Sequence, residues 1–258
     1  MHQGLTAMAV IVVTGRGGAG KTTTANLSTY FAQAGYRVLA IDGDLYLPNL
    51  GLHFALDNVK YTLHSIVKNP NMDPEWAIYR HEQTGVYVMP GSPRLEDVLG
   101  VSGQRLKDVI ENLKYKYPVI FVDSPTGVPF DTLPAFESFN YQIIVVEIER
   151  SPIYSFETMV ENEVLKLKAL GDRFKLDVGV VINKVREAAD VIDKIVETIE
   201  EDIGVPVLGV IPFDDAVPES INVGIPVLVY KPRSDAALAF KEAGQLTEEW
   251  IFGSSSRS

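Results

Sequence analysis

The chain has 258 residues, of which 46% are hydrophobic, and this is enough to bury the core of one large α/β domain. It contains no cysteine, which excludes disulfides, thiolate metal sites and cysteine nucleophiles, and its net charge of -11 argues against a general affinity for DNA or anionic lipid. No apolar run reaches the roughly 18 to 20 residues of a membrane-spanning helix, and no secretory signal is visible. We therefore expect a cytoplasmic protein with one domain over residues 1–252, and a disordered tail or cloning scar at 253–258.

Seven short apolar segments, rich in β-branched residues, predict strands, and turn residues and helical patterns separate them. Most of these segments are apolar without alternation, as expected for strands that are covered on both faces. The order of the elements predicts an α/β fold, with a mostly parallel sheet of about seven or eight strands and helices on both faces. The predicted strands are residues 8–14, 37–42, 85–90, 119–123, 141–148, 177–183 and 206–212.

Three segments carry clear helix signals. The first follows a glycine-rich run and ends near Gly35, which we expect at its C-cap. A second helix is predicted to begin with Ser151 as N-cap and Pro152 at its first position, and a third covers roughly residues 234–252. Apolar residues recur at helical spacing in the second helix and should face the sheet: Ile153, Phe156, Val160, Val164 and Leu167.

The stretch from Asp44 to Pro93 is less periodic and is richer in proline, asparagine and histidine than the rest of the chain. This composition predicts loops and short helices on the side of the sheet nearest the ligand. His53, His64 and His81 lie in this stretch without the spacing of a metal site. We therefore interpret them as surface or packing residues.

The run "GRGGAGKT" matches the pattern G-x-x-x-x-G-K-[ST] and lies between a predicted strand and a predicted helix. Glycines allow successive backbone N–H groups to turn toward phosphate oxygens, and the following helix directs the positive end of its dipole at them. Lys21 would then neutralise the β and γ phosphates, and the Thr22 hydroxyl would bind Mg²⁺. The predicted nucleotide-binding residues here are Gly15, Gly17, Gly18, Ala19, Gly20, Lys21, Thr22 and Thr23.

Acidic residues end two of the predicted strands. Asp123 follows four apolar residues and could hold the hydration shell of the metal. Asp42 and Asp44 flank one glycine at the end of the second strand, where open parallel sheets bind ligands. An isolated D-G-D would indicate a solvated turn. Next to a phosphate loop and Asp123, it indicates a functional site.

Together, these motifs resemble the MinD/ParA family of deviant phosphate-loop ATPases, and most closely its archaeal MinD-like members. The likeness covers nearly the whole chain. It rests on the segments "GGAGKTT", "IDGDLYLPNLGL", "YTLHSIV", "VIFVDSPTG", "VVINK", "VIPFD" and "GIPVLVYKPRSDAALAF".

The resemblance implies a homodimer that forms in the ATP state, in which a basic residue of each loop reaches the phosphates of the partner. The family has lysine at that position, and this chain has Arg16. An arginine could still act on the γ-phosphate, because its planar fork offers two donors and stays charged. It could equally misplace the contact, and then the chain would be a nucleotide-gated scaffold with little hydrolysis.

The resemblance also implies roles for the acidic residues in an ATPase. Asp44 would polarise the attacking water and act with Lys21 and Arg16 in catalysis. Asp42 and Asp123 would join Thr22 in holding Mg²⁺, and residues 124–127 would sense the γ-phosphate. These separate roles fit phosphoryl transfer, because that reaction depends mainly on the positioning of the reactants and on positive charge near the transferred oxygens.

Asn183 ends a predicted strand at the position where such proteins recognise the adenine amino group. A guanine-specific N-K-x-D motif would need Asp at position 186, which is Arg186, so ATP is favoured over GTP. Pro212 and Asp214 match a second adenine-side loop, although an ordinary strand-ending turn explains them almost as well.

Several relatives are excluded by chemistry. Nitrogenase iron protein and Mrp-type carriers need interface cysteines, and partition ATPases coat DNA through basic patches that this acidic chain does not show. The last helix has several acidic residues and one lysine, so we predict no stable membrane attachment by this chain alone. Trp250, Ile251 and Phe252 should pack against the body or a partner. We expect a MinD-like switch with an unidentified activator or effector protein, and ATP or ADP with Mg²⁺ as cofactors.

Overall fold

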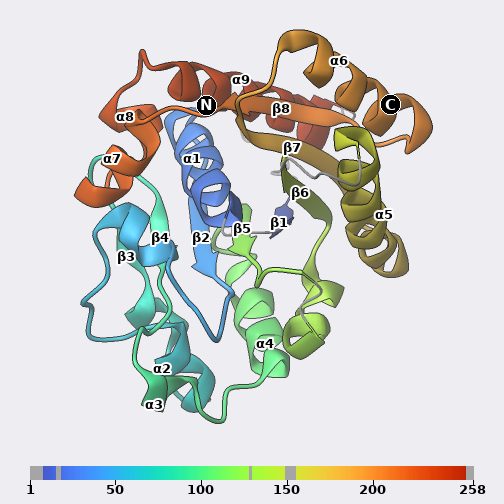
Figure 1. Cartoon of the computed structure of the whole chain (residues 1–258). Helices are drawn as coiled ribbons and strands as arrows, with labels where there is room; N and C mark the ends of the chain where they lie inside the picture. The colour runs from blue at the N-terminus through green and yellow to red at the C-terminus, as the bar shows by residue number, and fades with distance from the viewer. Residues whose placement is uncertain (1–7, 16–18, 128–129, 149–154, 254–258) are drawn as a thin grey trace.

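The structure is a computed structural model that describes residues 8–15, 19–127, 130–148 and 155–253. Within these residues, eight strands form one sheet in the order β3-β4-β2-β5-β1-β6-β7-β8. β1 lies in the middle and pairs in parallel with β5 and β6 (Figure 1). The predicted α/β fold is therefore confirmed. The strands are β1 (Ala9–Gly15), β2 (Val38–Asp42), β3 (Tyr79–Arg80), β4 (Tyr87–Met89), β5 (Val119–Asp123), β6 (Tyr141–Glu147), β7 (Asp177–Val185) and β8 (Val207–Pro212).

Helices cover both faces of the sheet, as the order of elements predicted (Figure 1). The described α-helices are α1 (Ala19–Gln33), α2 (Leu63–Lys68), α3 (Leu95–Val98), α4 (Gly103–Leu113), α5 (Phe156–Phe174), α6 (Ala189–Glu197), α7 (Ala216–Val223), α8 (Val227–Tyr230) and α9 (Asp235–Phe252). Shorter helical turns are η1 (Leu50–Phe54), η2 (Pro74–Ala77), η3 (Phe130–Ser138) and the π-helical η4 (Thr198–Asp202).

The core has two sides because successive side chains of a strand point to opposite faces. In β1, Ala9, Ile11 and Val13 pack with residues of α1, α7, α8 and α9. Val10 and Val12 pack on the other face with residues of α2, α4 and η3. α5 and α6 continue the second layer over β6 and β7. Every residue of β1 is buried, which explains why its sequence shows no alternation.

The first helix ends as its sequence predicts. Gly35 has a positive φ of 97° and donates to the carbonyl of Ala32, while Tyr36 donates to that of Phe31. These two bonds form a Schellman motif, which requires a left-handed residue and so favours glycine. This motif therefore ends α1 at a defined position in the sequence.

The start of α5 differs from the sequence prediction. The predicted caps Ser151 and Pro152 lie outside the described residues, and α5 has Ser155 as its N-cap, whose side chain accepts from the N–H of Thr158. Of the predicted stripe, the described side chains Val160, Val164 and Leu167 are buried. The sequence also missed β3, a two-residue antiparallel edge strand that is too short to show a pattern.

α9 packs its last turn on the body of the protein. The Trp250 ring lies 5.1 Å from that of Tyr141, and Phe252 stacks on Tyr36 at 5.3 Å. Ile251, which lies between these two residues in the sequence, is also buried. We predicted packing on the body or on a partner, and the structure shows these residues packed on the body. None of the helices in the described ranges is long and apolar enough to cross a membrane.

Candidate nucleotide-binding site

The site begins at the junction between β1 and α1. β1 ends at Gly15 and α1 begins at Ala19, so the N-terminus of α1 lies at the carboxyl edge of the sheet. The predicted residues Arg16, Gly17 and Gly18 lie outside the described residues. A helix N-terminus at this edge offers unpaired N–H groups and a positive dipole end to an anion.

Two glycines of the predicted loop are also needed for contacts within the protein. A Cβ on Gly15 would lie 2.4 Å from the carbonyl oxygen of Val145 in β6. One on Gly20 would lie 2.9 Å from Oδ1 of Asp123. Both contacts are closer than van der Waals packing permits, so larger residues would push the loop away from β6 and β5. The glycine-rich pattern therefore reflects close packing as well as the phosphate approach that the motif predicts.

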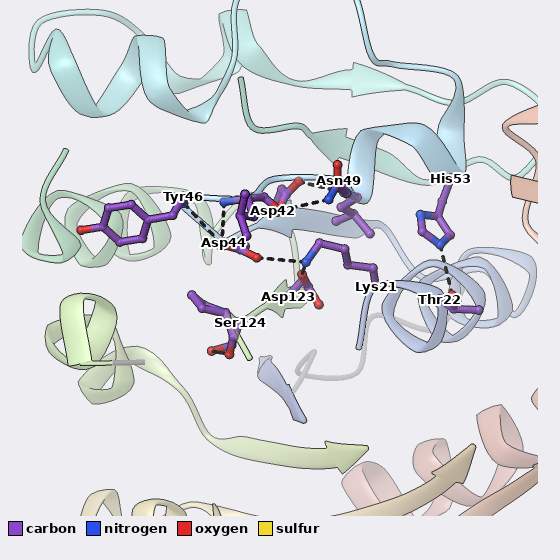
Figure 2. Close-up of polar contacts among 12 residues, drawn as sticks. Lys21, Thr22, Asp42, Asp44, Tyr46, Asn49, His53, Asp123 and Ser124 are labelled. Atoms are coloured by element: carbon purple, nitrogen blue, oxygen red, sulfur yellow. Dashed lines mark hydrogen bonds and ion pairs between the residues drawn. The ribbon is translucent and has the colours of Figure 1, made fainter. Parts of the chain in front are cut away.

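Lys21 is the centre of the described site. Its Nζ lies 3.1 Å from Oδ2 of Asp44 and 3.1 Å from Oδ2 of Asp123, and all three residues are buried (Figure 2). Asp42 and Asp123 are directly opposite each other in the parallel pairing of β2 and β5. The adjacency of these strands, with α1 beside them, thus brings together a lysine and three carboxylates from three separate segments of the chain.

The charges of this cluster are strongly coupled. Burial raises the pKa of Asp42 and of Asp123, and the charge of Asp123 raises the pKa of Asp42 further, whereas Lys21 opposes both shifts. Burial alone would lower the pKa of Lys21, but Asp123, Asp42 and Asp44 outweigh it and raise the pKa. Lys21 therefore stays protonated. The cluster holds three carboxyl groups and one ammonium group, so a bound cation would favour the ionised form of the carboxyl groups.

Backbone N–H groups hold the two carboxylates that follow β2. Asp42 Oδ2 accepts from the N–H of Leu50 at 2.8 Å, at the start of η1. Asp44 Oδ1 accepts from Tyr46 and Leu47, which leaves Oδ2 for Lys21 (Figure 2). Asp42 Oδ1 is buried and has no hydrogen-bond partner among the described residues. An unpartnered buried carboxylate oxygen fits a site that receives a hydrated cation.

Both ends of the predicted switch segment, residues 124–127, form backbone hydrogen bonds to β1. The N–H of Ser124 donates to the carbonyl of Val13 at 3.0 Å, and that of Gly127 donates to Gly15 at 3.1 Å. Gly127 has a φ of 78°, which glycine adopts without strain. The segment therefore lies directly beside the end of β1.

Thr22 and Thr23 are both buried in the first turns of α1. Thr22 Oγ1 lies 3.2 Å from Nε2 of His53 in η1 (Figure 2). Burial lowers the pKa of His53 to about 4, and the backbone of Asn49 opposes that shift. His53 is buried, as the packing interpretation allowed, but its contact with a predicted metal ligand was missed. The one hint was a polar residue inside the short apolar run "LGLHF".

The predicted adenine side lies at the ends of β7 and β8. Asn183 is buried at the end of β7, and its Oδ1 accepts from the N–H of Lys184, which has a positive φ of 56°. β7 is separated from β1 by β6 alone, so the two strand ends are roughly 10 Å apart. One extended ligand can span this distance along the sheet edge.

Asp214 makes contacts that belong to the fold. Its two carboxylate oxygens accept from Ala216 in α7 and from Ala236 in α9. Burial alone would raise the pKa of Asp214, but these backbone N–H groups lower it. Pro212 is the last residue of β8. The contacts of Asp214 are those of a turn that joins two helices, and its adenine-side role stays a prediction.

The parallel sheet, the strand-to-helix junction and the buried lysine among carboxylates define the phosphate-loop class of nucleotide-binding proteins. Residues 10–227 match the CobQ/CobB/MinD/ParA nucleotide binding domain. The chain therefore belongs to this family, and the predicted relation to MinD and ParA is confirmed.

Known proteins are similar over nearly the whole chain. An uncharacterized ATP-binding protein of Methanocaldococcus jannaschii is 33% identical over 241 residues, which cover 92% of this chain and 86% of that protein. The chloroplastic septum site-determining protein MinD homolog of Arabidopsis thaliana is 30% identical over 252 residues, 93% of this chain and 74% of that protein. The structure of septum site-determining protein MinD from Pyrococcus horikoshii, complexed with Mg-ADP, has a TM-score of 0.82 and 32% identity, covering 94% of this chain and 97% of that one.

Proposed function

We propose that the chain is an ATP-driven switch, which binds and hydrolyses Mg-ATP and dimerises in the ATP state. The observation that carries this proposal is the Lys21 ammonium held at 3.1 Å from both Asp44 and Asp123, beside the N-terminus of α1. A lysine and a helix N-terminus attract phosphate, and the excess of carboxylates attracts a cation. Mg-ATP brings both charges to one place.

Each residue would have a separate task in hydrolysis. Lys21 would exchange carboxylate contacts for oxygens of the transferred phosphate, and Asp44, freed from that ion pair, would orient the attacking water. Asn183 would bind the adenine amino group. When bound, magnesium would neutralise phosphate charge, and Thr22, Asp42 and Asp123 would hold it directly or through water.

Among the described residues, no group of three or more His, Asp or Glu side chains could hold a metal by itself. The proposed ion would therefore take other ligands from water, from the Thr22 hydroxyl and from phosphate. Magnesium commonly binds in this way because it gives up its waters reluctantly.

The relatives named as septum site-determining proteins suggest a role in cell organisation. We propose that the ATP-bound dimer engages an effector protein, and that hydrolysis releases it. Arg16 would reach the phosphates of the partner. If it does so poorly, the chain would act as a nucleotide-gated scaffold with slow turnover.

Phosphate release at multiple turnover tests the enzyme, with Asp44→Ala as the inactive control. Size measurement with ADP, ATP and a non-hydrolysable analogue tests the switch, with Arg16→Ala as the matched variant. We expect an ATP-dependent dimer that Arg16→Ala loses. Equal inactivity of wild type and control, together with one mass in every state, would contradict the proposal.

A further inference from the structure

η1 links two of the predicted metal-site residues. It begins at Leu50, whose N–H donates to Asp42, and it includes His53, whose ring contacts Thr22. Asp42 ends β2, whereas Thr22 lies in α1. A single short turn therefore touches the carboxylate and the hydroxyl from one side.

The position of η1 is fixed at its other end. Ala55 ends the turn in the left-handed conformation, with a φ of 53°. It packs so closely on Gly224 that a Cβ there would lie 2.5 Å from the Ala55 nitrogen. Phe54, next to His53, is fully buried. His53 is therefore carried by a backbone that is held on both sides.

Thr22 must meet a specific hydrogen-bond requirement if its oxygen binds a cation. The lone pairs of Oγ1 then face the metal, so the hydroxyl hydrogen needs an acceptor on the other side. Lys21 cannot serve, because an ammonium group only donates. His53 Nε2, at 3.2 Å, can accept this hydrogen when the ring proton is on Nδ1, which is buried and makes no hydrogen bond within the described residues.

We propose that His53 is a positioning residue for magnesium binding, which accepts the Thr22 hydroxyl hydrogen and so turns the Thr22 oxygen toward the ion. This inference rests on the proposed function. It adds a second layer to the metal site and assigns η1 the task of setting Asp42 and Thr22 relative to each other. His53 acts through Thr22 and does not touch the nucleotide.

The test compares ADP binding by calorimetry with Mg²⁺ and with EDTA, which separates the magnesium effect from the nucleotide contacts. His53→Leu removes the acceptor, and His53→Gln restores an oxygen at a similar reach. We expect His53→Leu to reduce the gain in ADP affinity from Mg²⁺ by about tenfold, as for other residues that orient metal ligands. His53→Gln should recover most of this gain. Affinity in EDTA should stay within about twofold, because phosphate contacts are unchanged.

Thr22→Val provides the coupling control. In that background, His53→Leu should cause no further loss, because the hydroxyl that it positions is absent. If His53→Leu does not fold, as judged by its melting curve, His53→Asn replaces it, since the shorter amide is polar but does not reach Thr22.

An unchanged magnesium gain in the non-accepting variant would overturn the inference, and so would equal losses with Mg²⁺ and with EDTA. Equal losses would assign His53 a purely structural role. Wild-type protein that shows no Mg²⁺-dependent ADP binding would overturn the proposed function as well. The two failures are therefore distinguishable.

Discussion

At the end of the site formed by β1, β2 and β5, ionisable side chains are buried against one another and satisfy each other only in part. Lys21 serves two carboxylates there, and Asp42 keeps an oxygen without a partner among the described residues. At the end formed by β7 and β8, polar side chains accept hydrogen bonds from backbone N–H groups. Asn183 accepts from the next residue, and Asp214 accepts from two helices.

This difference separates a charged site from a scaffold. Burying unpaired charge costs free energy, so a fold keeps such a cluster chiefly where a ligand completes it. Satisfied groups such as Asp214 already stabilise the protein without any ligand. The end that contains Lys21 and Asp42 is therefore expected to respond strongly to substitution and pH, and the end that contains Asn183 and Asp214 weakly.

The largest effect is expected at Lys21. Lys21→Ala removes the only cation that contacts both Asp44 and Asp123 in the described part of the chain. We expect roughly 10²- to 10³-fold lower kcat/KM for ATP, because a positioned charge on the transferred oxygens is lost. Phosphate-release assays measure this loss, and Lys166→Ala on the exposed surface of α5 is the control. If Lys21→Ala kept an activity within tenfold of wild type, the expected contrast between the two ends of the site would be wrong.

Asp44→Asn should separate turnover from binding. The amide can still accept from the backbone, but it no longer pairs with Lys21 or repels phosphate. We expect kcat to fall at least about 100-fold, while ATP affinity stays equal or rises, because Lys21 becomes free for phosphate. Single-turnover assays and calorimetry measure the two effects, with the exposed Asp57→Asn as control. Weaker ATP binding in Asp44→Asn would contradict this account.

Asn183→Asp tests the predicted adenine-binding role of Asn183. The carboxylate can still accept from Lys184, but the amide donor is lost. We expect about tenfold weaker ATP binding and a smaller preference for ATP over GTP, because an amide can both donate to and accept from adenine. Competition binding with both nucleotides measures the change, and Asn112→Asp on α4 is the matched control. An unchanged preference would mean that adenine is recognised elsewhere.

The pH dependence of the free energy of unfolding should distinguish Asp42 from Asp214. Burial raises the pKa of Asp42, so the folded, ligand-free protein keeps a proton that the unfolded chain has released. This group therefore lowers the free energy of unfolding, by up to about 1.4 kcal/mol per pH unit, as pH rises above the ordinary carboxyl range. Urea unfolding of Asp42→Asn should show a smaller fall. An identical pH profile in Asp42→Asn would contradict the raised pKa of Asp42.

Asp214 should show the opposite sign and the smallest effect. Its pKa is lowered, so it adds stability above the ordinary carboxyl pKa and loses it as pH falls through the lower folded value. We expect Asp214→Ala to cost about 1 kcal/mol at neutral pH, as for other helix caps, with nucleotide affinity unchanged. Urea unfolding and calorimetry measure both quantities. A clear loss of ATP affinity would instead support its predicted adenine-side role.

The sequence by itself determined the mostly parallel sheet, the strand that precedes the glycine-rich run and the helix that follows it. These features depend on local signals, namely buried apolar runs, glycine conformations and caps such as Gly35. The motif also named Lys21 and the acidic strand ends, because their spacing from the strands is fixed along the chain. Local patterns could not find β3, which gains its pairing from β4.

Only the tertiary structure decided which of these residues meet. Asp42 and Asp123 face each other because β2 and β5 are neighbours, although 81 positions separate their numbers in the sequence. His53 reaches Thr22 because η1 folds back over α1, and Asp214 is satisfied because α7 and α9 begin beside it. Hydrogen bonds and charge coupling act over a few ångströms in space, and the order of strands in the sheet, which no single segment encodes, sets those distances.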